Sequence, residues 1–317
     1  QSFQAHNVAH SYWQAPYRHN GKYETAEYGP DLDNKYALEF IEKHKQGPFF
    51  LYYTPLLSHN PFCPTPDSRD RKCTDWQSNF EDMVAYTDRM VGNVIQQLKD
   101  LGIYENTVIV YTSDNGTKTC GGKMKDGRVI YGMKGMLTLD GCRMPLIVKS
   151  DGKHRQRDDL ITFSDFYPSF CELAGIPPEK IADTIDGVSF APLLKGETKS
   201  LRPSIFSYYG MNNSAYVRTQ RFKYYIDQRL YDLEADPREH HPIYPATDTA
   251  VTAQARKELK QNMDAFVDDP HHASAVHKKA VLALQKKYAG TPAEYELGTQ
   301  QYNGISEKPK SVSWTYD

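Results

Sequence analysis

The stretch FEDMVAYTDRMVGNVIQQLKDLGIYENTVIVYTSDNG, residues 80–116, predicts a helix, a turn and a strand in succession. Its methionines, valines and leucines recur at helical spacing, and Gly102 stands where the end of a helix is expected. The run TVIVYT (107–112) is short, apolar and rich in β-branched residues, which is typical of a strand. The abrupt change to Ser, Asp, Asn and Gly marks the end of that strand.

The same plan occurs on both sides of this stretch. DNKYALEFIEKHKQGPFFLYYTP (33–55) predicts a helix followed by a strand, FFLYYT, over residues 49–54. MPLIVK (144–149) predicts another strand, and TFSDFYPSFCELAGI (162–176) predicts another helix. Helices that alternate with apolar strands predict an α/β fold, with a mostly parallel sheet between helices.

The pattern changes after residue 200. SIFSYYG, SAYVRTQ, FKYYID and RLYDLEADP predict short antiparallel strands with tight turns. We therefore expect a core over residues 1–200, a small antiparallel α+β subdomain over 201–248, and a helical segment with a tail over 249–317.

Composition excludes some classes of partner. The 317 residues are 39% hydrophobic and 25% charged, with a net charge of −2, so nothing indicates nucleic acid or a membrane surface. The longest apolar runs have about six residues, too short for a transmembrane span. Of the five cysteines, Cys63 and Cys73 lie on either side of a short polar loop. The sequence allows either a disulfide between them or two free thiols.

The corner after residue 112 has two interpretations. Asp114 and Asn115 offer hard oxygen donors, and Gly116 lets the backbone turn so that both can face one point. Ligands bind beyond the carboxyl ends of parallel strands, so a Ca²⁺ or Mg²⁺ site is one interpretation. An Asx turn is the other, because Asp-Asn-Gly is also ordinary turn chemistry.

Two further loops place a reactive or charged side chain at the same expected edge of the sheet. His59 follows the 49–54 run, and Lys134 lies in a loop that returns to the 144–149 strand. Taken singly, each is an ordinary surface residue. Taken with the acid-amide pair, they form a set that binds a tetrahedral oxyanion, because cations hold its charge and His or Lys protonates a leaving oxygen.

Five blocks in order resemble the type I sulfatases of the alkaline-phosphatase-like superfamily, and among these the bacterial enzymes that act on polysaccharides. The blocks are PFFLYYTPLLSHNPF (48–62), the stretch 80–116, KGMLTLDGCRMPLIV (134–148), FSDFYPSFCELAGI with DGVSFAPLLKG (163–196), and RLYDLEADP (229–237). The resemblance implies that Asp114 and Asn115 ligate one Ca²⁺. It also implies that His59 contacts the sulfate or leaving oxygen and that Lys134 binds a sulfate oxygen.

The chain departs from the family pattern at the nucleophile. The family oxidises a Cys or Ser to formylglycine in a C/S-x-P/A-x-R motif, and neither CPTPD at Cys63 nor CRMP at Cys142 matches it. The family's other calcium ligands are an Asp pair near its N-terminus, whereas the Asp pairs here, 158–159 and 268–269, lie downstream in other contexts. The resemblance therefore implies that an N-terminal segment of the same protein supplies both, and that these 317 residues alone are inactive.

The resulting expectation is a Ca²⁺-dependent sulfatase acting on a sulfated small molecule or polysaccharide, in the periplasm or secreted. A phosphate or phosphonate ester hydrolase of the same superfamily is one alternative, and a non-catalytic sulfatase-like binding module is another. The residue at the nucleophile position separates them: Cys or Ser indicates a sulfatase, Thr indicates phosphoryl transfer, and an inert residue indicates binding. The substrate and the oligomeric state are not determined by the sequence.

Overall fold

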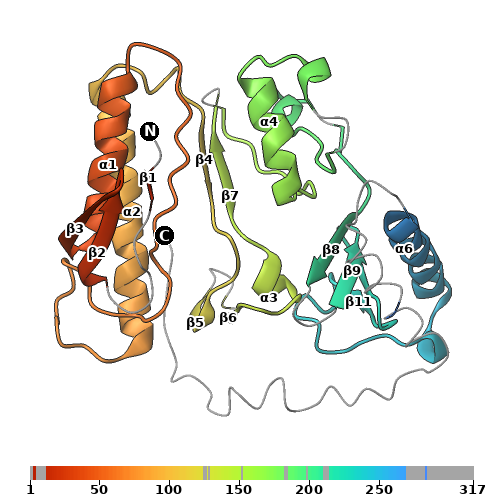
Figure 1. The fold of residues 1–317 in the computed structure, drawn as a ribbon. Helices are drawn as coiled ribbons and strands as arrows, with labels where there is room; N and C mark the ends of the chain where they lie inside the picture. Colours follow the sequence, from red (N-terminus) through yellow and green to blue (C-terminus); the bar gives the residue numbers. More distant parts are fainter. Residues whose placement is uncertain are drawn as a thin grey trace. The chain divides into compact units, whose positions relative to one another are not determined.

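The computed structural model forms two compact units, which are described separately (Figure 1). The described residues of the first unit fall within 1–134 and 144–150, and those of the second fall within 135–143 and 151–310. The residues that the structure describes are 3–4, 12–123, 127, 129–150, 153–181, 185–197, 199–209, 214–268 and 283.

The first unit begins with a three-stranded antiparallel sheet. Its order is β1 (Phe3–Gln4), β2 (Trp13–His19) and β3 (Lys22–Tyr28). Asn20 and Gly21 join β2 to β3 with φ of 48° and 84°, which is the left-handed backbone that a tight hairpin needs. This hairpin was not predicted, although Asn-Gly between two alternating runs is a usual signal for one.

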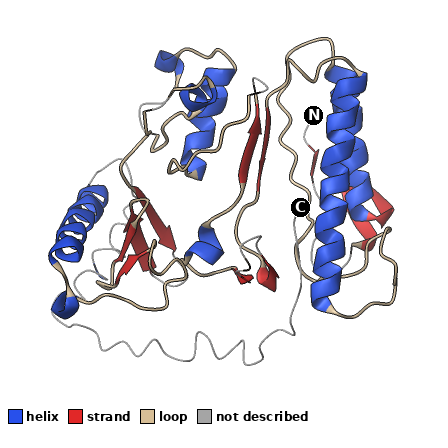
Figure 2. Cartoon of the chain, turned by 180° about the vertical axis from the view of Figure 1, so that it is seen from behind, coloured by secondary structure: helices blue, strands red, loops and turns tan. Residues whose placement is uncertain are grey.

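Two long helices of the first unit lie side by side in both views (Figures 1 and 2). They are α1 (Gly29–His44) and α2 (Trp76–Asp100), and both helices were predicted. The carboxylate of Asp75 caps α2 by accepting the Ser78 N–H at 2.8 Å. Gly102 follows α2 with φ of 68°, which confirms it as the residue that ends this helix.

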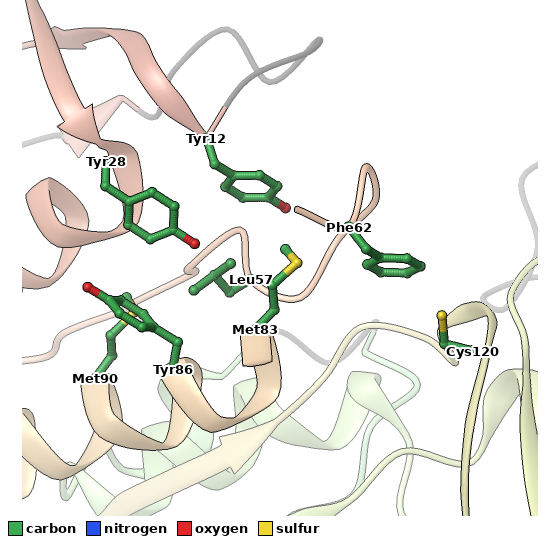
Figure 3. Packing of buried hydrophobic residues seen from close by; sticks show 8 residues of the cluster. All are labelled: Tyr12, Tyr28, Leu57, Phe62, Met83, Tyr86, Met90 and Cys120. Carbon is green, nitrogen blue, oxygen red and sulfur yellow. The ribbon is translucent and has the colours of Figure 1, made fainter. Parts of the chain in front are cut away.

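A buried cluster packs α2 against the loop between the two helices and against Tyr28 at the end of β3 (Figure 3). It is rich in tyrosine and methionine, so several rings bring a hydroxyl into the core. Its members are Tyr12, Tyr28, Leu57, Phe62, Met83, Tyr86, Met90 and Cys120.

The predicted mostly parallel sheet is not confirmed by the strands that the structure describes, because every pairing among them is antiparallel. In the first unit β4 (Ile109–Thr112) pairs with β7 (Leu146–Lys149), and β5 (Lys118–Lys123) pairs with β6 (Val129–Met133). Parallel strands need a crossover, which is usually a helix. The β5–β6 pair and a single helical turn, α3 (Leu139–Cys142), stand between β4 and β7 instead, so the chain returns in the opposite direction.

The strand predicted over residues 49–54 is also absent from the described structure. Phe50 is 65% exposed and Tyr52 is 80% exposed, while Phe49, Leu51 and Tyr53 are half-buried. Apolar residues alone do not make a strand, because its backbone groups need a neighbouring strand to pair with. Here the segment has none among the described residues.

The second unit contains a helical part organised by one carboxylate. Thr162 and Asp165 form a capping box at η1 (Phe163–Asp165), which continues into α4 (Phe166–Leu173). The Asp165 side chain is fully buried and also accepts the Val188 N–H at 2.8 Å. Further short elements among the described residues are η2 (Pro178–Lys180), α5 (Ala191–Leu194) and η4 (Pro245–Thr247).

The other described part of the second unit is a four-stranded antiparallel sheet that packs against a long helix. The sheet runs in the order β11 (Leu230–Asp232), β10 (Phe222–Tyr225), β9 (Ser214–Arg218), β8 (Ile205–Tyr209). All four strands fall in the stretches predicted to be short antiparallel strands. The helix α6 (Ala250–Asp268) supplies Leu259 and Met263 to a core that also contains Ala215, Val217, Tyr224, Ile226 and Leu230.

Two further features bear on the expectations from sequence. None of the described helices combines the length and the hydropathy that a membrane span requires. All five cysteines are free thiols, so Cys63 and Cys73 are not bonded to each other. The division of the chain into domains at residues 200 and 248 remains a prediction.

Candidate functional site

The Asp-Asn corner lies between two strands of the first unit. β4 ends at Thr112 and β5 begins at Lys118, with Asp114 exposed and Asn115 half-buried between them. Neither side chain makes a hydrogen bond with another described residue, so the hydrogen bond that defines an Asx turn is not seen here. Their oxygens are therefore uncommitted within the described part of the chain.

Lys134 and the Asp-Asn corner lie at the same end of the β5–β6 pair. Its backbone N–H donates to the Thr117 carbonyl at 3.1 Å, which extends the pairing of Lys118 with Met133 by one position. The approach is close, because a Cβ on Gly132 would lie 2.0 Å from the Thr117 oxygen. The Lys134 side chain is exposed, directly after β6.

His59 lies on the loop between α1 and α2. Its backbone N–H donates to the Leu56 carbonyl at 2.9 Å, and its ring Nδ1 lies 2.5 Å from the Asn60 carbonyl oxygen. A carbonyl oxygen only accepts, so Nδ1 carries a proton in this arrangement. Nε2, the other ring nitrogen of this exposed residue, is then the position left to contact a ligand.

A buried tyrosine holds this loop in place. The Tyr12 hydroxyl lies 2.6 Å from the His59 carbonyl and 3.1 Å from the Leu56 carbonyl. Burial raises the pKa of Tyr12 well above its usual range, so this group stays a donor. Tyr12 was missed by sequence reasoning, since its partners are more than forty positions away.

The first turns of α2 contact both the His59 loop and β5. On the loop side, the Phe62 ring packs edge-on against Trp76, with centroids 5.7 Å apart. On the β5 side, the Gln77 amide donates to the Gly121 carbonyl at 2.9 Å, and its oxygen accepts the Gly121 N–H at 3.2 Å. One helix end therefore positions the loop that carries His59 and the strand that follows Asp114.

The side-chain oxygens of Asp114 and Asn115 are the type of ligand that a hard cation prefers, but they are too few to complete its shell. Asp114 and Asn115 offer three side-chain oxygens, whereas Ca²⁺ takes about six to eight. Among the described residues, no three His, Cys, Asp or Glu side chains gather as a metal site would require. Asp114 and Asn115 could therefore supply only part of a Ca²⁺ shell.

Neither cysteine considered at the sequence level has the properties of a nucleophile. Burial raises the pKa of the half-buried Cys63 thiol to about 11, which keeps it protonated at neutral pH. The Cys142 thiol donates to the Thr138 carbonyl at 3.0 Å. Both are structural thiols in this arrangement.

Comparison with known families identifies the chain. Residues 1–176 match the family described as Sulfatase, and residues 130–268 match the family described as N-sulphoglucosamine sulphohydrolase, C-terminal. The first match covers more than half of the chain and all four predicted site residues. The chain belongs to the sulfatase family.

Curated sulfatases from animals and bacteria are similar to it. Human arylsulfatase A is 28% identical over 269 residues, covering 71% of this chain and 51% of that protein. The N-acetylglucosamine-6-O-sulfatase of Bacteroides thetaiotaomicron is 30% identical over 213 residues, covering 61% and 36%. The dog N-acetylgalactosamine-6-sulfatase is 32% identical over 181 residues, covering 55% and 34%. The chain thus spans about half or less of the curated relatives it matches.

Solved structures confirm a sulfatase-like fold. A protein in complex with its substrate D-glucosamine-2-N,6-O-disulfate matches with a TM-score of 0.64 at 19% identity, covering 85% of this chain and 77% of that one. The PsFucS1 sulfatase from Pseudoalteromonas sp. matches with a TM-score of 0.63 at 19% identity, covering 87% and 59%. At these identities the likeness concerns the fold alone.

Proposed function

We propose that this chain is part of a sulfatase that hydrolyses sulfate esters of a hexosamine-containing carbohydrate. The observation that carries the proposal is the family match over residues 1–176, which contains His59, Asp114, Asn115 and Lys134. The substrate class rests on two relatives at 30% and 32% identity, both named for 6-sulfates of N-acetylhexosamines.

The residues suit that chemistry in specific ways. The transition state for sulfate ester hydrolysis is a sulfur centre with negative charge on its oxygens, and the Lys134 ammonium would stabilise that charge. As the bond from sulfur to the sugar oxygen breaks, the leaving oxygen needs a proton. An imidazolium of His59 would donate it from Nε2, because Nδ1–H is engaged by the Asn60 carbonyl.

The calcium role is part of the same proposal. Asp114 and Asn115 would hold one Ca²⁺ together with ligands from outside the described residues, and the ion would add positive charge beside the sulfate. The formylglycine nucleophile of the family is likewise expected outside this chain.

The test uses the natural protein that contains this chain. It is assayed with an aryl sulfate, with N-acetylglucosamine 6-sulfate and with an aryl phosphate, in the presence of Ca²⁺. We expect turnover of the sulfates, with a loss of about 10²–10⁴-fold in kcat for His59→Ala and for Lys134→Ala. A Lys99→Ala variant, on the exposed face of α2, is the matched control and should keep wild-type rates.

The outcomes separate the alternatives. Turnover of the aryl phosphate in preference to both sulfates would assign the chain to phosphate ester hydrolysis. Binding of the sulfated sugar without turnover would support a non-catalytic module.

A further inference from the structure

The loop between the His59 segment and α2 carries a run of charge that the proposed mechanism does not use. Residues 69–72 are Arg-Asp-Arg-Lys, called the basic turn below, and all four are exposed. They lie in the first unit, as His59 does.

The loop that presents the basic turn is tied down at several points. The buried Asn79 amide nitrogen donates to the Phe62 carbonyl at 3.2 Å and to the Cys73 carbonyl at 3.1 Å. This one side chain therefore closes both ends of the loop. Between these ends, Arg89 of α2 binds both carboxylate oxygens of Asp67, at 2.8 and 2.6 Å.

Within the turn the single acid is engaged by its own backbone. The Asp70 carboxylate accepts the Lys72 N–H at 2.8 Å, and the Asp70 carbonyl accepts the Cys73 N–H at 3.3 Å. Arg71 lies over the Trp13 ring, 4.9 Å from its centroid. Neither Arg69 nor Lys72 pairs with a carboxylate among the described residues, unlike Arg89.

An exposed aromatic residue follows the basic turn closely in the chain. Trp76, the first residue of α2, is 50% exposed, and its ring packs against Phe62. Because Asn79 holds positions 62 and 73 together, chain geometry limits the Cα separation of His59 and Lys72 to about 25 Å. A carbohydrate chain of a few sugar units can span that distance.

We propose that the basic turn and Trp76 form a subsite for a second sulfate group of a polyanionic carbohydrate chain. This inference rests on the proposed function, in which another sulfate of the same chain lies at His59. The Arg69 guanidinium presents a planar fork that matches a sulfate, and Lys72 adds a point charge. The Trp76 ring offers an apolar face to a sugar. Because the loop is already fixed by Asn79 and Arg89, little ordering is needed on binding.

The test measures binding of a heparin-derived hexasaccharide and of its chemically desulfated counterpart to the natural protein. The variant is Arg69→Gln/Lys72→Gln, and the matched control is Lys35→Gln/Lys43→Gln, which removes two exposed cations from α1. We expect about tenfold weaker binding of the sulfated hexasaccharide in the basic-turn variant, with a shallower dependence on salt. The control should bind as wild type does, and the desulfated chain should bind all three proteins weakly and equally.

Unchanged binding by the basic-turn variant, or an equal loss in the control, would overturn the subsite. The conservative pair Arg69→Lys/Lys72→Arg should restore most of the affinity, and equal thermal midpoints would exclude misfolding as the cause of the loss. Absence of aryl sulfate turnover in the wild-type protein would instead count against the proposed function, and binding through the basic turn would still be measurable.

Discussion

Lys223 of β10 and Glu239 form an ion pair that is closed off from solvent. The distance from Nζ to Oε1 is 2.9 Å, and the side chains are 0% and 1% exposed. The Glu239 carboxylate also accepts the Tyr225 hydroxyl at 2.5 Å and the Leu139 N–H at 2.8 Å. Lys223 donates in addition to the Leu137 carbonyl. This pair therefore ties the segment around α3 to the four-stranded sheet of the second unit.

Breaking this pair should be costly. In Glu239→Gln the ammonium of Lys223 stays buried without a counter-charge, and we expect the free energy of unfolding to fall by about 3–5 kcal/mol in urea titrations. Glu258→Gln, on the exposed face of α6, is the control and should change it by less than about 0.5 kcal/mol. The double variant Lys223→Met/Glu239→Leu removes both charges, and should recover a large part of the loss. A double variant as unstable as Glu239→Gln would contradict this account.

The stability of the first unit should depend on the protonation of Asp33. This carboxyl is buried in α1, where Oδ2 lies 3.3 Å from the Tyr17 hydroxyl and Oδ1 has no described partner. Burial raises its pKa from 3.8 to about 7, so in the folded protein the carboxyl is mainly neutral below pH 7. As the pH rises from about 4 to 7 the unfolded chain loses this proton and the folded chain does not. The Asp33 carboxyl therefore lowers the free energy of unfolding progressively between about pH 4 and pH 7, by up to about 4 kcal/mol.

Replacing Asp33 by Asn removes that dependence. The free energy of unfolding of Asp33→Asn relative to wild type should rise between pH 4.5 and pH 7.5, as measured by urea titration at each pH. Asp100→Asn, at the exposed end of α2, controls for the loss of one carboxylate. An Asp33→Asn curve that runs parallel to wild type across this range would show that the carboxyl is charged in the folded protein.

Substituting alanine for glycine should lower the stability of the protein at one position and raise it at another. A Cβ on Gly187 would lie 1.9 Å from the Ser164 carbonyl oxygen, so Gly187→Ala forces backbone movement and should destabilise by about 1–3 kcal/mol. Gly92 is an exposed residue inside α2 with nothing within 4 Å of the added atom. Gly92→Ala should therefore stabilise by about 0.5–1 kcal/mol. Thermal unfolding of the two variants, side by side with wild type, decides both signs.

The calcium assignment predicts a ligand-dependent shift in stability. In the natural protein, added Ca²⁺ should raise the thermal midpoint, because an ion that binds only the folded state stabilises it. Asp114→Ala should abolish that rise, and Asp100→Ala should leave it intact. If Asp114→Ala keeps the full calcium-dependent shift, the ion binds elsewhere.

The sequence by itself determined several of the local elements and the family. The apolar periodicity of residues 80–100 and the glycine at 102 were sufficient for α2 and its end, because both are local effects of helix geometry. The order of five motif blocks was sufficient for the sulfatase resemblance, which the family match over residues 1–176 confirms. The candidate residues His59, Asp114, Asn115 and Lys134 came from the same blocks, and their roles remain predictions.

Only the tertiary structure decided how these elements pair and what holds them. An apolar run such as 49–54 reads as a strand, but strand formation depends on a neighbour that the run does not encode. The antiparallel direction of β4 and β7 follows from the path of the chain between them. Tyr12 beneath His59, and Glu239 beside Lys223, are contacts between residues far apart in sequence. Local periodicity carries no information about such partners, because their energies arise from burial and hydrogen bonding in the folded chain.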